Sequence, residues 1–257
     1  MFDRLTDQMR LRSAALLLTV DSRLDRILQG WLLITGLLAA ARIAFTPIHM
    51  PVSGLSTVGS YLLLILAPFI STLLALRWFR DGDLQSQPHT RLAIAGAWRP
   101  VSRTEAKNHP LYGSGGIMVS LLVGIMLNVP VRAAEYLAAM PPMPDDAPRW
   151  LSVLHGAMTL DVVLFGSLYM IAFVAGLRRV PLFPRLLAAI WLGDLTMQLI
   201  TAKLVAETGD LPPAVGTALH HLLDGNVKKV LISVALWLPY LLLSKRVNVT
   251  FRHRLPE

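Results

Sequence analysis

Polar and charged side chains recur at helical spacing inside otherwise apolar stretches of this 257-residue sequence. Asn128, Arg132 and Glu135 stand at positions i, i+4 and i+7, so they share one face of a helix. Asp194 and Gln198 repeat the first step of that spacing in a later stretch. Such groups are costly at bilayer depth, which makes them candidates for a functional or structural site.

The other polar candidates come from two further apolar stretches and are His155, Asp161, Asn226 and Lys229. Counted by helical rise, Asp161, Asp194 and Lys229 lie at similar depth in the outer half of a bilayer. Asp224 precedes Lys228 by one helical turn and can neutralise it. We therefore expect the four stretches to converge, with Lys229 neutralising Asp194 or Asp161.

Three kinds of chemistry fit such a cluster. It can be a structural ion pair that fixes helix packing, or a polar pocket for a ligand or an ion. It can also be the site of a lipid-modifying enzyme, with Asp161 or Asp194 as general base and His155 as a second acid–base group. The sequence has no Cys, no Gly-x-Ser-x-Gly elbow and no His-Glu-x-x-His helix. We therefore assign no catalytic residue, no metal and no cofactor.

The composition excludes a large soluble catalytic domain. Hydrophobic residues make up 54% of the chain and charged residues only 16%, against about 25% charged in soluble domains. The mean hydropathy is +0.55. A net charge of +8 would suggest nucleic acid in a soluble protein. Here the basic residues flank apolar stretches, so they predict membrane topology and not a nucleic-acid partner.

Six apolar stretches are long enough, or nearly so, to cross a bilayer. They are residues 28–48, 58–78, 116–137, 151–177, 182–205 and 226–243. These stretches predict an all-α, polytopic membrane helix bundle. Lys and Arg concentrate at both chain ends and in every second connection, so both termini should be cytoplasmic.

This topology divides the chain into four segments. They are a cytoplasmic amphipathic N-terminal segment (1–27), a first transmembrane hairpin (28–80), a cytoplasmic linker (81–112) and a four-helix membrane domain (113–254). In the first segment, one apolar stripe of a helix is expected to contain Leu5, Met9, Leu16, Leu17, Val20, Leu24 and Ile27. That helix can lie on the membrane surface, or it can pack on the protein's own loops.

The second half of the chain carries three stretches with a familiar pattern. They read YGSGGIMVSLLVGI, LRRVPLFPRLLAAIWLGDL and ALWLPYLLLSKRVNVTFRHR. Over about residues 111–254 the chain resembles the bacterial membrane family catalogued as domain of unknown function 2569. The residues that match its closing signature are Pro239, Tyr240, Ser244, Lys245, Arg246, Val247, Thr250 and Phe251. The chain departs from the pattern at Ile117, where the family often has Trp, and in its additional N-terminal helix pair.

The resemblance implies a four-helix inner-membrane unit to which no activity is assigned, so it transfers no catalytic residue. We accordingly expect a multi-pass bacterial inner-membrane protein that acts as a non-enzymatic helper or interaction partner. A small transporter or lipid-binding protein that uses the polar cluster is the alternative, and an intramembrane lipid-modifying enzyme is the third possibility. The expected partners are membrane lipids, with a protein or a second copy of the chain as further candidates.

Overall fold

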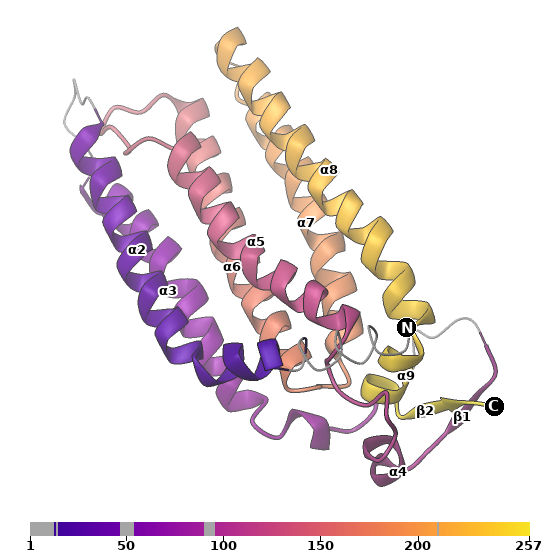
Figure 1. Ribbon diagram of the computed structural model, residues 1–257. Coiled ribbons are helices and arrows are strands. Elements are labelled where there is room, and N and C mark those ends of the chain that lie inside the picture. Colours follow the sequence, from indigo (N-terminus) through magenta and orange to yellow (C-terminus); the bar gives the residue numbers. More distant parts are fainter. Residues whose placement is uncertain (1–12, 14, 47–53, 90–95, 210) are drawn as a thin grey trace, which may run out of the picture.

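The structure is a computed structural model that describes residues 13, 15–46, 54–89, 96–209 and 211–257. Six helices in this part are long and apolar enough to cross a membrane. They are α2 (Leu24–Phe45), α3 (Gly54–Trp78), α5 (Ile117–Ala139), α6 (Arg149–Leu177), α7 (Phe183–Ala206) and α8 (Pro213–Leu243). The helices run alongside one another, as Figure 1 shows. The predicted all-α membrane bundle is therefore confirmed, and the chain is a multi-pass membrane protein.

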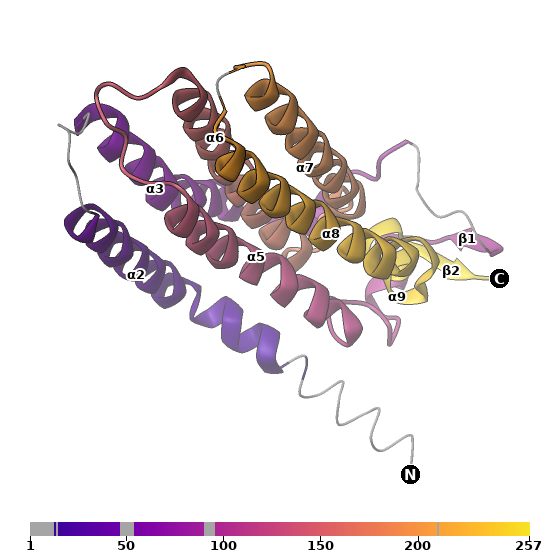
Figure 2. The same ribbon diagram turned by 90° about the horizontal axis from the view of Figure 1, so that it is seen from above.

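Helix α6 is the central helix of the bundle. It packs against α3, α5 and α7, while α8 packs on α7 and α2 on α3 (Figure 2). In its most apolar window 61% of the residues are buried, against 17% in α2 and in α8. Helices α2 and α8 therefore turn most of their apolar surface outward. Because α3 packs on α6, the hairpin segment 28–80 belongs to the same helix bundle as the four-helix segment 113–254.

Three helix starts differ from the sequence prediction by four residues or more. Helix α8 begins at Pro213, well before the expected start at residue 226, α2 begins at Leu24 instead of 28, and α3 begins at Gly54 instead of 58. The early start of α8 follows from Pro212 and Pro213, because proline has no N–H to leave unpaired and its fixed φ suits the first turn. The start was placed too late because polar residues dilute the hydropathy of the first turns of α8.

A small residue allows close approach where α5, α6 and α7 meet. A Cβ atom added to Gly176 would lie 2.4 Å from the side chain of Leu122 and 2.9 Å from that of Phe183. Leu122 and Phe183 are themselves completely buried. Gly176 therefore sets the separation of these three helices near the end of α6.

The described part of the linker 81–112 is folded onto the C-terminal tail. It contains the short helix η1 (Gly82–Leu84), strand β1 (Trp98–Pro100) and helix α4 (Arg103–Lys107). After α8 come helix α9 (Lys245–Arg252) and strand β2 (Arg254–Pro256), which pairs antiparallel with β1. The sequence analysis did not predict this two-stranded sheet, since three-residue strands are too short for a periodic pattern.

The described part of the N-terminal segment packs on the bundle. Residues 15–22 are helical, and Leu17 and Leu24 are buried in the same apolar core as the ends of α5 and α6. This favours packing on the protein itself, although Leu16 and Ile27 of the predicted stripe are exposed. Leu5 and Met9 lie outside the described residues. The start of α2 and strand β2 lie at the same end of the bundle (Figure 1), as an even number of spans requires.

Candidate functional site

A buried ion network joins three helices in the middle of the bundle. Arg132 of α5 donates through Nη1 to Oδ2 of Asp161 on α6, at 2.5 Å. Its Nη2 donates to Oδ2 of Asp194 on α7, at 2.6 Å. The side chains of Arg132, Asp161 and Asp194 are 11%, 5% and 0% exposed. One guanidinium thus bridges two carboxylates, and the sequence-predicted cluster contains a real contact between α5, α6 and α7.

Two further donors complete the hydrogen bonding of the carboxylates. Nε2 of Gln198 donates to Oδ1 of Asp161 at 3.0 Å and to Oδ1 of Asp194 at 3.3 Å. The hydroxyl of Tyr169 donates to Oδ2 of Asp194 at 2.9 Å. All four carboxylate oxygens therefore accept at least one hydrogen bond. A buried polar network is stabilising only when its members are satisfied in this way.

Aromatic rings close the network on one side. The guanidinium carbon of Arg132 lies 5.4 Å from the ring centroid of Phe165 and 5.9 Å from that of Tyr169. Both distances are within the range of a cation–π contact. Asp161, Phe165 and Tyr169 follow one another at intervals of four residues, so α6 presents them on one face. That spacing was the available signal for Tyr169, which the sequence analysis missed.

Lys229 does not have the partner that the sequence analysis gave it. Its Nζ contacts Oε1 of Glu135 on α5 and lies 3.4 Å from Oδ1 of Asn226. The prediction that Lys229 neutralises Asp194 or Asp161 is therefore wrong. The depth estimate was adequate, but it does not include the direction of each side chain around its helix. Lys229 of α8 instead contacts Glu135, which lies three residues after Arg132 on the same face of α5.

The structure also shows where the other predicted polar residues of α5 and α8 lie. Lys228 pairs with Asp224 at 2.7 Å, as expected from their spacing. Asn128, Arg132, Glu135, Asn226 and Lys229 line one small cavity of about 30 Å³ between α5 and α8. That volume holds one or two water molecules and is too small for a substrate.

His155 belongs to a separate hydrogen-bonded group. The hydroxyl of Tyr136 lies 3.3 Å from Nε2 of His155 and 2.7 Å from Oγ1 of Thr159. The ring of Tyr61 packs edge-on against Tyr136, with centroids 6.3 Å apart. His155 therefore hydrogen bonds to the phenol of Tyr136. Asp161, in contrast, interacts with Arg132 and Gln198. The pairing of Asp161 and His155 as two acid–base groups has no geometric support.

Among the described residues, no three His, Asp or Glu side chains form a group that could hold a metal ion. The buried network of Arg132, Asp161 and Asp194 instead keeps charged groups inside the bundle. Two carboxylates and one guanidinium carry a formal charge of −1, which the dipoles of Tyr169 and Gln198 stabilise. Removing one member of such a buried network strands its partners and costs about 3–5 kcal/mol.

No family model, curated protein or solved structure matches this chain. The resemblance to the family of domain of unknown function 2569 therefore stays a prediction. What is known of the site comes from its own geometry.

Proposed function

We propose that this chain is a non-enzymatic multi-pass protein of the bacterial inner membrane that serves as a helper or interaction partner for other membrane components. The observation that carries the proposal is the closed network of Arg132, Asp161 and Asp194, in which every carboxylate oxygen already accepts a hydrogen bond. A general base needs an oxygen within reach of a substrate. The cavity beside Arg132 leaves no room for one.

The surface of the bundle supports the same proposal. Leu33, Ile34 and Leu37 on α2 are each at least 60% exposed, as are Ile232 and Leu236 on α8. These faces are available to lipid chains or to another membrane helix. The concentration of Lys and Arg in alternate connections and in the tail supports a cytoplasmic location for both termini, by the positive-inside rule.

In-cell photo-crosslinking tests the interaction. A photoreactive amino acid at Leu37, which is 63% exposed, should give a discrete adduct with a protein, either a partner or a second copy. The matched control is Leu64 on α3, which is 1% exposed and should give none. The absence of any protein adduct from the outward positions of both α2 and α8 would contradict an interaction role.

A second candidate is a small transporter or lipid-binding protein that uses the polar cluster. One observation favours it: the network holds two acids for one base, and the pair of Lys229 and Glu135 lies beside it on the side facing α8. An excess carboxylate is a group that could take up a proton or cation. This candidate predicts ion or proton uptake into vesicles that Asp161→Asn abolishes.

A further inference from the structure

An apolar cavity lies among four helices of the bundle, α2, α3, α5 and α6. Its volume is about 360 Å³, within the size range of small-ligand sites. Its walls include Trp31 of α2, Phe69 of α3, Met126 of α5 and Met170 of α6. Helix α2, which forms one wall, lies at the edge of the bundle (Figure 2). Among the lining residues that the structure describes, none belongs to the buried ion network of Arg132.

Three residues of the walls explain why side chains leave this space open. Gly30 has no side chain, and a Cβ atom added there would meet nothing within 4 Å. Pro68 lies inside α3 and Pro130 inside α5, where each ring removes one backbone hydrogen bond and bends its helix. In addition, α2 packs mainly on α3 and touches α5 at few points. The space between α2 and α5 is therefore not filled by the protein itself.

The polar side chains in the walls already have partners. Nε1 of Trp31 donates to the carbonyl of Ile65 at 2.8 Å. Oγ1 of Thr72 donates to the carbonyl of Pro68 at 2.6 Å. The other described side chains that line the cavity are apolar. The walls thus offer a ligand no charge and no unpaired side-chain N–H or O–H group, which disfavours a polar ligand and also water.

The cavity lies at the depth of lipid chains. With a rise of 1.5 Å per residue, Gly30 is about 9 Å from the start of α2 and Leu127 about 15 Å from the start of α5. Met170 is about 10 Å from the end of α6 by the same rise. All three helix ends are on the side of the bundle that carries the chain termini. These depths fall in the half of a hydrocarbon core of about 30 Å that is nearer to the termini.

The cavity connects the surface of the bundle with its interior. Ile34 of α2 and Leu127 of α5 line it and are 60% and 52% exposed. Thr72, Val129 and Met170 also line it, and these three residues are buried. An apolar chain that entered between α2 and α5 would therefore reach residues that the surrounding lipid does not touch.

The cavity is unfavourable when it is empty. Its walls then lose packing contacts, and this cost rises with the volume of the cavity. An apolar cavity of about 150 Å³ stays dry and accepts benzene, so this larger cavity has room for an alkyl chain. At this depth the apolar molecules available to fill it are the lipid chains of the same leaflet.

We propose that this cavity binds one fatty acyl chain of a phospholipid, from the leaflet on the side of the chain termini. The chain enters between Ile34 and Leu127, and its middle carbons contact Trp31 and Val129. It completes the packing between α2 and α5, which have few direct contacts. The site is separate from the network of Arg132, so it does not rest on the helper function proposed above.

Photolabelling of the full chain in vesicles tests the proposal. The probe is a phosphatidylcholine with a diazirine midway along one acyl chain, and the adducts are mapped by mass spectrometry. We expect adducts at Thr72, Val129 and Met170, which are buried but line the cavity, as well as at the lipid-facing Leu37. Leu122 is the negative control, because it is completely buried in α5 away from the cavity and should carry no adduct.

A matched pair of variants tests whether the chain occupies the cavity itself. Gly30→Leu places a side chain in the open space, and it should fold because leucine favours a helix more than glycine does. It should abolish the adducts at Val129 and Met170 and keep the adduct at Leu37. Gly36→Leu makes the same change on the same helix, also with nothing within 4 Å of the added Cβ, at a position that does not line the cavity. It should label like the wild type.

Several results would overturn the proposal. One is a wild type labelled only at outward-facing positions, which needs no variant to be decisive. Others are unchanged adducts at Val129 and Met170 in Gly30→Leu, or an equal loss of them in Gly30→Leu and Gly36→Leu. Interior adducts that disappear as the ratio of protein to lipid rises would show that a second copy of the chain covers the cavity instead.

Discussion

Removing Arg132 perturbs the buried network at its centre, because this one guanidinium contacts both Asp161 and Asp194. Arg132→Met keeps most of the apolar bulk and deletes the charge. Both carboxylates then lose their cation in a site where they are 5% and 0% exposed. We expect a loss of about 3–5 kcal/mol in the free energy of unfolding. For a chain of this size that corresponds to a fall in Tm on the order of 10 °C.

The assay is thermal unfolding of the purified protein in one detergent, followed by tryptophan fluorescence. The triple variant Arg132→Met, Asp161→Asn, Asp194→Asn removes all the formal charge and should recover part of the loss. Arg99→Met is the control, since Arg99 pairs with Glu105 while 57% exposed, and it should cost well under 1 kcal/mol. A wild-type Tm for Arg132→Met, or a triple variant no more stable than the single one, would show that the two carboxylates do not depend on this cation.

Three further predictions concern single contacts. Tyr169→Phe removes one of the donors to Asp194 and should lower the free energy of unfolding by about 1–2 kcal/mol, measured by denaturant titration. Gly176→Ala should cost about 1–3 kcal/mol by overpacking, whereas Gly124→Ala, with nothing within 4 Å of the added Cβ, should not destabilise α5. Burial would raise the pKa of Asp83, but its ion pairs with Lys107 at 2.6 Å and Arg103 at 3.4 Å outweigh burial and lower that pKa. The stabilisation by these pairs is therefore present at neutral pH and is lost as the pH falls through the folded-state pKa. Asp83→Asn should thus lower the Tm at neutral pH but not in strong acid, and an equal loss at both would contradict this.

The architecture could be predicted because it depends on hydropathy, which is a property of composition over a long window. Six stretches of the sequence met the length of a bilayer span, and all six are helices in the structure. The start of α8 was placed too late because Thr217, His220, His221 and Asp224 lower the hydropathy of residues 213–225. Helix formation there follows from Pro213 at the first position, a local signal that a hydropathy window does not register.

The membership of the polar cluster was more predictable than its pairing. Helical spacing placed Arg132 and Glu135 on one face of α5, and the structure gives both a partner. The choice of partner depends on how each helix is rotated about its axis and on which helices are neighbours. Neither quantity follows from one sequence. The sequence prediction therefore paired Lys229 with the wrong acid, although the expected depth of Lys229 was close to that of Asp161.

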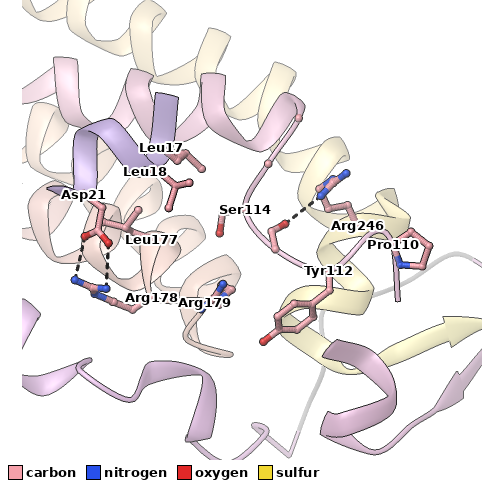
Figure 3. A pocket seen from close by; sticks show the side chains of 13 residues that line it. Leu17, Leu18, Asp21, Pro110, Tyr112, Ser114, Leu177, Arg178, Arg179 and Arg246 are labelled. Carbon is pink, nitrogen blue, oxygen red and sulfur yellow. Dashed lines mark hydrogen bonds and ion pairs between the residues drawn. The ribbon is translucent and has the colours of Figure 1, made fainter. Parts of the chain in front are cut away.

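A cavity of about 440 Å³ at the end of the bundle that carries the linker and the tail was the least predictable feature (Figure 3). Its walls come from the N-terminal helical segment, the loop before α5, the end of α6 and the start of α9, which are distant in the sequence. The Gly-Ser-Gly-Gly stretch was visible, but it follows no strand and matches no nucleotide-binding pattern. The left-handed Arg179 carries no sequence signal, because arginine at a helix end usually indicates only a favourable charge.

Proton flux through the reconstituted protein tests most directly whether the network of Arg132, Asp161 and Asp194 is a closed structural core. Vesicles that contain the wild type and a pH-sensitive dye would be exposed to a pH gradient and a membrane potential. If the network is closed, the wild type should acidify at the same rate as vesicles without protein, and Asp161→Asn should give that rate again. A faster rate in the wild type that Asp161→Asn or Asp194→Asn abolishes would show that the network is not closed and would identify it as a proton pathway.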